Sequence, residues 1–439
     1  MPGRRPENHT RDSADPSSSG LVRAISRWQL VGVSINDVIG SGIYLLPATA
    51  ALLLGPASLW AVALAGLAAL LLVLCFAQAA SHFDQPGGAY LYTREAFGDF
   101  VGFEVGWMTW LARVASVAAL VNGLALASGQ VWPGAVDGLG RVAVIVAGLG
   151  LVTWVNLVGV AAGARMAVVL TIGKLVPLVF FVVVGVWFAD GSVLTGVDQA
   201  PLDRQRLAEA ALLLLFAYAG FENTPAAAGE YANPRRDVPF AMLTMIAVVT
   251  MIYVGVQAVA LMTLPGLATS EAPLAEAAGR FAGPIAVGLL TVGAVVSILG
   301  NIGNTMLIGP RYLFALARDG YGPVWFGRVH PRWRTPAAAI GIQAAIALVL
   351  AVSGSFVQLA LLSVVARLAG YLGVAAAVPI LQRRFADAPS AFVLPGGPII
   401  PILAFAVASV LLLATRVENL LAGAIALAIG VLIYLFRRR

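Results

Sequence analysis

The stretch INDVIGSGIYLLP, residues 35–47, decides how this chain folds. It lies inside an apolar segment, yet it contains an acidic residue, the run Gly40-Ser41-Gly42 and a proline, which all disturb a helix. Opening a helix in lipid leaves backbone N–H and C=O groups unpaired, at several kcal/mol each, unless protein, water or a ligand completes those bonds. The stretch therefore predicts a membrane helix that is interrupted at a place where a cavity or a ligand meets the backbone.

The composition indicates a polytopic membrane protein. Of the 439 residues, 60% are hydrophobic and only 11% are charged, and the mean hydropathy is +0.91. A soluble domain carries about 25% charged residues. The net charge of +6 is no sign of nucleic-acid binding, because the basic residues lie in short loops. With a single Cys and three His, we expect neither disulfides nor a metal site, and no cofactor.

Apolar runs near the roughly 20 residues that cross a bilayer occur about twelve times. With the N-terminus inside, the inner segments hold 19 arginines and the outer loops 5. This bias predicts that both termini are cytoplasmic in a protein of the plasma (inner) membrane. The polar residues 1–24 are predicted to be a disordered cytoplasmic tail. The runs lie at 27–50, 56–81, 102–130, 141–160, 163–189, 206–229, 238–263, 282–311, 335–353, 356–381, 398–415 and 418–436.

The sixth run has an interruption that matches the first. Its stretch FAYAGFENTP, residues 216–225, combines Gly220, Glu222, Asn223 and Pro225 at its centre. Breaks five helices apart are typical of an inverted repeat. We therefore expect an all-α fold of about twelve transmembrane helices, with discontinuous helices one and six. Its two five-helix repeats are expected at 25–195 and 200–385, and two further helices at 395–436.

Paired breaks favour a binding site made of backbone. The N-terminus of a half-helix presents N–H groups and a positive dipole end that suit a carboxylate, and freed carbonyls suit an ammonium group. A free α-amino acid carries both charges. A single Gly- and Pro-rich helix would be explained better as a kinked span, but two such breaks in corresponding halves favour the binding site.

Four stretches of the chain resemble the amino acid–polyamine–organocation superfamily of permeases. The resemblance covers nearly the whole chain from about residue 25. The resemblance implies the leucine-transporter fold and alternating access. The stretches are IGSGIYLLPA (39–48), QPGGAYLYTREAFGDFVGFEVGW (85–107), FAYAGFENTPAAAGEYANPRRDVPFA (216–241) and RYLFALARDGYGPVWFGRVHPRWRTP (311–336).

The resemblance also implies roles for residues at both breaks. Ser41 and Gly42, next to Gly40, match residues whose backbone N–H groups hold the substrate carboxylate. Residues whose carbonyls face the substrate amino group are matched by Val38, Phe216 and Ala219. The Phe216 ring also occupies the place of an aromatic gate over the ligand, and Glu222 is expected to link gate movement to proton transfer.

Lys174, the only lysine, lies within the fifth run. An ionisable residue inside a span is a functional candidate, and burial favours the neutral amine. Some permeases of the superfamily carry a lysine where sodium-driven relatives bind an ion. We therefore expect Lys174 to cycle a proton and to couple transport to the proton gradient. The alternative is a permanently charged lysine that braces helix one against helix five.

Further polar residues lie inside the spans. Ser297, Asn301 and then Asn304 or Thr305 form one stripe on the eighth run. The stripe is expected to line an aqueous path or pack against the broken first helix, and a purely structural seam is an equal alternative.

Three more charged residues fall within spans. Asp37 and Arg113 are expected to form a buried pair; alternatively Asp37 selects a cationic substrate side chain, or Arg113 an anionic one. Arg367, in the tenth run, receives no role beyond pairing or reaching water.

The most consistent function is secondary transport of an amino acid, with proton-coupled uptake preferred and amino-acid exchange as the alternative. An enzyme is disfavoured because G-x-S-x-G, H-E-x-x-H and P-loop motifs are missing. A channel or a nutrient sensor on the same fold is a weaker reading. The expected partners are a small amino acid and the lipid bilayer, not nucleic acid. Neither the individual substrate nor the oligomeric state follows from the residues.

Overall fold

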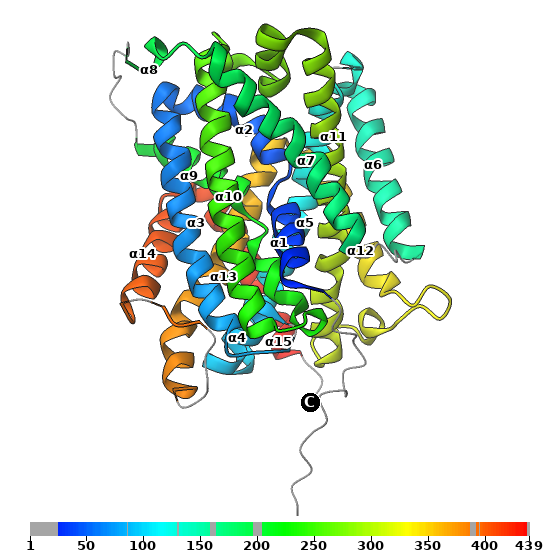
Figure 1. The fold of residues 1–439 in the computed structure, drawn as a ribbon. Coiled ribbons are helices and arrows are strands. Elements are labelled where there is room, and N and C mark those ends of the chain that lie inside the picture. The colour runs from blue at the N-terminus through cyan, green and yellow to red at the C-terminus, as the bar shows by residue number, and fades with distance from the viewer. Residues whose placement is uncertain are drawn as a thin grey trace, which may run out of the picture.

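The protein is a bundle of helices in the computed structural model, shown in Figure 1. The structure describes residues 25–436 except 86, 130, 159–163, 196–203, 387–391 and 395. The predicted tail at residues 1–24 therefore lies outside the described residues. Within the described part there is no β-strand, and one isolated backbone bridge joins Ile25 to Tyr231. The expected all-α fold class is confirmed.

Every predicted apolar run coincides with a helix or with a broken helix. The long helix α11 begins before its predicted start and bends at Gly283, where φ is 72°. Apart from the two interrupted spans, the long helices are α3 (Ser58–Ala80), α5 (Asp99–Ser128), α6 (Gly138–Val158), α7 (Ala164–Gly185), α10 (Pro234–Thr263), α11 (Pro273–Arg318, with its kink at Gly283), α12 (Ala337–Ser353), α13 (Phe356–Arg384), α14 (Ile399–Leu413) and α15 (Val417–Leu435). Two shorter helices, α4 (Gly88–Phe97) and α8 (Ser192–Thr195), lie in connections.

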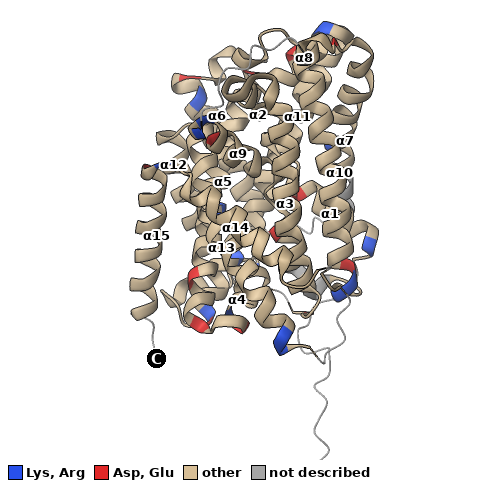
Figure 2. Cartoon of the chain, turned by 90° about the vertical axis from the view of Figure 1, so that its left-hand side faces the viewer, with Lys and Arg blue, Asp and Glu red and all other residues tan. Residues whose placement is uncertain are grey.

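The bundle is built to lie in a membrane. Eight stretches of described helix, one of them the joined run 41–80, are long and apolar enough to span a bilayer, and α12 and α14 are shorter apolar helices. Large apolar side chains are exposed on the outer faces, for example Trp60 at 72% and Leu64 at 62%. Charged residues gather towards the two ends of the bundle, with few between them (Figure 2). The protein is therefore an integral membrane protein.

Both predicted interruptions are present. The first span consists of α1 (Arg27–Val38) and α2 (Ser41–Leu54), separated at Ile39 and Gly40. The sixth consists of α9 (Arg204–Tyr218) and a 3-10 helix, η5 (Phe221–Glu230). The second half of this span is thus more tightly wound than an α-helix, and it contains Pro225, which has no N–H to donate. In Figure 1, α2 lies towards the top and α1 below it; we call the two ends of the bundle the α2 end and the α1 end.

The two breaks pack directly against each other. Gly220 has a φ of +128°, and a Cβ at this position would lie 3.2 Å from Val38 Cα and still closer to the Asp37 carbonyl. A Cβ on Gly42 would lie 2.8 Å from Ala217 Cα. Only glycine permits this approach. The backbone of the first break therefore touches the backbone of the second in the middle of the bundle.

The contact between the breaks predicts a large effect of Gly220→Ala. Both the left-handed backbone and the collision with the Asp37 carbonyl oppose a Cβ, so we expect a loss of about 2–5 kcal/mol of unfolding free energy. The melting temperature of the purified variant in detergent should therefore fall clearly below that of the native protein. Gly303→Ala is the matched control, since nothing lies within 4 Å of a Cβ there. Equal melting temperatures for the two variants would contradict the packing of the breaks.

Candidate functional site

Lys174 reaches the first break from α7. Its Nζ donates hydrogen bonds to the carbonyls of Asn36, at 2.9 Å, and Ile39, at 3.0 Å, and the side chain is only 1% exposed. The amino group of Lys174 can be buried away from water because the carbonyls of Asn36 and Ile39, which have no helical partner where α1 ends, accept its hydrogen bonds. The structure thus places Lys174 between α7 and the broken first helix. Its predicted role in proton coupling stays a prediction.

The polar stripe on α11 also faces the first break. Ser297 Oγ donates to the Ile39 carbonyl at 3.2 Å, and Asn301 Nδ2 donates to the Asp37 carbonyl at 3.0 Å. The amide of Asn304 donates to the Asp37 carboxylate, and Thr305 Oγ1 donates to Asn301 Oδ1 at 3.3 Å. These hydrogen bonds join the stripe to the broken first helix, which fits both the expected packing against that helix and a purely structural seam. The aqueous path stays a prediction.

A tyrosine joins the two breaks. The hydroxyl of Tyr253, on α10, lies 3.0 Å from the Ala217 carbonyl and 3.4 Å from the Val38 carbonyl. One O–H group serves both acceptors, so neither carbonyl is saturated. This leaves Val38 able to accept a second hydrogen bond, as its expected role at a substrate amino group requires.

A small cavity of about 20 Å³ lies where the breaks meet; nearly all of its lining residues are buried, and we call it the closed cavity. Its lining brings together most of the predicted substrate-binding residues, whereas Asp37 and Arg113 do not line it. The hydroxyl of Ser41 is buried, with no hydrogen-bond partner among the described residues. The first N–H groups of α2 have no acceptor within their own helix. The cavity is lined by Val38, Gly40, Ser41, Gly42, Ser116, Leu120, Phe216, Ala217, Ala219, Asn301 and Arg367.

The expected pair between Asp37 and Arg113 is replaced by another one. Arg113 Nη2 lies 3.0 Å from Glu222 Oε1, and Arg367 Nη1 contacts the same oxygen. The other oxygen, Oε2, accepts hydrogen bonds from the Gly220 N–H at 3.0 Å and from the Tyr371 hydroxyl at 3.2 Å. Glu222 is therefore the acceptor at the centre of this cluster, and it holds the second break in place through Gly220.

Arg367 is the functional candidate that sequence reasoning missed. Its Nη2 donates to Ser116 Oγ at 2.6 Å, and its Nε donates to Ser363 Oγ at 3.2 Å. It lines the closed cavity and also a second one, of about 10 Å³, beside Tyr371. The only signal in the sequence was that an arginine lies inside a predicted span. Which way its side chain points depends on how α13 is turned in the bundle, and the sequence does not give that rotation.

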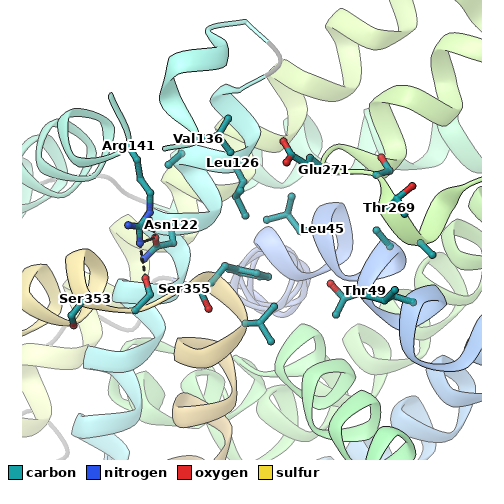
Figure 3. A pocket seen from close by; sticks show the side chains of 18 residues that line it. Leu45, Thr49, Asn122, Leu126, Val136, Arg141, Thr269, Glu271, Ser353 and Ser355 are labelled. Carbon is teal, nitrogen blue, oxygen red and sulfur yellow. Dashed lines mark hydrogen bonds between the residues drawn. The ribbon is translucent and has the colours of Figure 1, made fainter. Parts of the chain in front are cut away.

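A larger pocket of about 540 Å³ lies at the α2 end (Figure 3). Phe356, at the start of α13, lines this pocket, whereas Phe216 lines the closed cavity. Their ring centroids are 6.0 Å apart, with an angle of 83° between the planes. The pair of aromatic rings thus lies between the pocket and the closed cavity.

Arg141 fixes the wall of this pocket. Its guanidinium donates to Asn122 Oδ1 at 2.6 Å and to the carbonyls of Ala351, at 2.9 Å, and Gly354, at 2.5 Å. In Figure 3 it reaches Asn122, while Glu271 lies on the opposite side of the pocket. The start of α6 is thereby tied to α5 and to the turn that carries Phe356.

At the α1 end, ion pairs join the helices. Arg27 Nε lies 2.9 Å from Asp237 Oδ1, and Arg94 Nη1 lies 3.3 Å from Asp319 Oδ2. The Tyr90 hydroxyl donates to the same Asp319 oxygen at 2.5 Å, and burial together with this carboxylate raises the pKa of Tyr90 above its usual value. Among the described residues, no group of three or more His, Cys, Asp or Glu side chains that could hold a metal ion is found.

Comparison with known proteins gives concordant matches over the whole bundle. The family described as amino acid permease matches residues 25–435. The serine/threonine exchanger SteT of Bacillus subtilis is 30% identical, over 96% of this chain and 96% of its own. The branched-chain amino acid permease BcaP of the same organism is 26% identical over 97% and 95%, and its methylthioribose transporter is 27% identical over 97% and 96%.

The cluster around Glu222 predicts which charged residues depend on each other. In a double-mutant cycle on the melting of the purified protein, Arg113→Gln and Glu222→Gln should couple by about 1–3 kcal/mol, because each single change leaves a buried partner unsatisfied. The cycle of Arg113→Gln with Asp37→Asn is the control and should show a smaller coupling. A larger coupling to Asp37 than to Glu222 would contradict the observed pairing.

Proposed function

This chain belongs to the amino acid permease family, within the amino acid–polyamine–organocation superfamily, and on that premise we propose that it is a secondary active transporter that takes up amino acids together with protons. The observation that carries this proposal is the closed cavity at the meeting point of the two interrupted helices, with Ser41 and Gly42 in its wall.

The substrate is held by its two backbone charges. Its α-carboxylate accepts hydrogen bonds from the N–H groups of Ser41 and Gly42, where the dipole of α2 favours a negative charge. Its ammonium group donates to the carbonyls of Val38, Phe216 and Ala219. These residues line the same cavity, which has to expand from its volume of about 20 Å³ to admit an amino acid. These contacts are common to all α-amino acids, so they determine the class of substrate and leave the choice of side chain to other residues.

Alternating access is supported by the difference between the two ends. The rings of Phe216 and Phe356 separate the pocket at the α2 end from the closed cavity, and the ion pairs of Arg27 and Arg94 join the helices at the α1 end. The arginine bias of the sequence supports a cytoplasmic position for the α1 end. In the proposed cycle, movement of the aromatic pair admits the substrate, and the ion pairs at the α1 end separate to release it.

Lys174 supplies the coupling to protons. Its two carbonyl acceptors are satisfied equally by an ammonium group and by a neutral amine, which still carries two N–H donors. Loss of the proton therefore removes the charge but keeps both hydrogen bonds. Because the acceptors are backbone atoms of the first break, a change in the charge of Lys174 acts directly on the helix that binds the substrate.

Exchange is the second candidate, and the similarity to a serine/threonine exchanger favours it. The two modes differ in what they require. An exchanger needs an amino acid on both sides of the membrane, whereas a symporter accumulates substrate in empty liposomes when a proton gradient is imposed.

Counterflow in liposomes tests the transport proposal. Purified protein in liposomes preloaded with an unlabelled amino acid should accumulate the labelled one transiently and saturably, because carrier sites are limited in number. Each of the twenty amino acids serves once as the labelled substrate. Conductance without saturation would indicate a channel instead, and the absence of any flux would contradict transport.

The variant Lys174→Gln tests the coupling. Uptake driven by an inward proton gradient should fall to the level of protein-free liposomes, since a glutamine side chain keeps N–H donors but takes up no proton. Counterflow of the same substrate should persist and thus shows that the variant is folded. Retained accumulation driven by the proton gradient would rule out Lys174 as the coupling residue.

A further inference from the structure

We propose that the transported amino acid carries an anionic side chain, and that Arg367 is the residue that selects it. This inference rests on the proposed function and adds the substrate class. The sequence suggested Arg113 as the residue that recognises an acidic side chain. The inference assigns this role to Arg367 instead, because Arg367 lines the cavity.

The buried charges beside the cavity do not balance. Two guanidinium groups, those of Arg113 and Arg367, share the single carboxylate of Glu222. Asp37 lies within electrostatic reach of both Lys174 and Arg113, so these five buried groups carry three positive and two negative charges while Lys174 is protonated. The cluster is therefore left with one excess positive charge, in a place where a charge without a partner is costly.

The other buried acidic residues lie elsewhere. Asp237 is paired with Arg27 at the α1 end. Glu104 lies nine residues before Arg113 on α5, which is about 14 Å along the helix axis, and it packs against Gly430 of α15. Neither residue compensates the cluster, so a bound ligand with a negative charge would balance it in the state in which Lys174 is protonated.

Arg367 is placed to receive that ligand. It lines the closed cavity, and its neighbour there, Ser116, accepts its Nη2 hydrogen bond. A guanidinium group has five N–H donors, and three partners are engaged: Ser116, Ser363 and Glu222. Donors therefore remain for an incoming carboxylate. By contrast, Arg113 does not line this cavity.

The rest of the lining also favours a polar side chain. Next to Arg367 the wall contains Asn301, Ser116 and Ser41, and the Ser41 hydroxyl is buried without a hydrogen-bond partner among the described residues. A branched apolar side chain would leave the Ser41 hydroxyl buried without a hydrogen-bond partner, which is unfavourable. A second carboxylate would accept from Arg367 and from the free hydroxyl at the same time.

The decisive comparison uses the native chain. In counterflow with the full-length protein in liposomes, labelled aspartate should be carried at least about tenfold more efficiently than labelled asparagine, its neutral isostere, because a site built for a charged group rejects the uncharged analogue. Glutamate should exceed glutamine in the same way. Leucine and serine measure the neutral background.

Variants assign the preference to a residue. Arg367→Gln should abolish the difference between aspartate and asparagine, and Arg367→Lys should restore part of it by restoring the charge. Arg416→Gln is the matched control, because Arg416 pairs with Glu209 on the exposed surface and should leave the ratio unchanged. If Arg367→Gln fails to fold, the aspartate-to-asparagine ratio of the native chain still decides.

The outcomes separate this inference from the proposed function. Transport of serine or leucine without any preference for aspartate would overturn the inference and leave the transport proposal intact. Flux of neutral amino acids that depends on chloride would overturn it as well, since an inorganic anion would then balance the cluster. No flux of any amino acid would instead refute the transport proposal itself.

Discussion

The structure depends on one constraint: each backbone group freed by an interrupted helix must find a partner away from water. At the end of α1 this is achieved with side chains from three other helices. Lys174, Ser297 and Asn301 donate hydrogen bonds to the carbonyls of residues 36, 39 and 37, respectively. The Tyr253 hydroxyl lies near the remaining carbonyl, that of Val38. What stays open is the start of α2, with its N–H groups and the hydroxyl of Ser41. The break is thus closed on one side and available for a ligand on the other.

The same constraint explains why the charges of the bundle interior gather at the breaks. A carboxylate inside a membrane protein needs several donors, and Glu222 finds two guanidinium groups, a tyrosine hydroxyl and the N–H of Gly220. The cluster therefore joins α5 and α13 to the second break. Because Arg367 also lines the cavity, a movement of α13 that opens the cavity would change these contacts.

Much of this could be predicted from the sequence because it follows from local residue pattern. The spans, both interruptions, the stripe with Asn301 and the place of Lys174 are local properties of one segment each. The partner of Arg113 was not predictable, because whether it meets Asp37 or Glu222 depends on how three helices are turned and crossed. The position of Arg367 in the cavity wall and the 3-10 winding after Gly220 depend on the same packing.

The most direct test of a substrate site between the broken helices is protection of a thiol placed there. The native Cys75 is buried and is replaced by alanine, and Ser41→Cys then introduces a thiol of similar size into the wall of the cavity. A transported amino acid is expected to slow the reaction of this thiol with a small alkylating reagent, while Ser192→Cys, at an exposed position, reacts at an unchanged rate. Equal rates at residue 41 with and without a substrate that the same protein demonstrably transports would contradict the account.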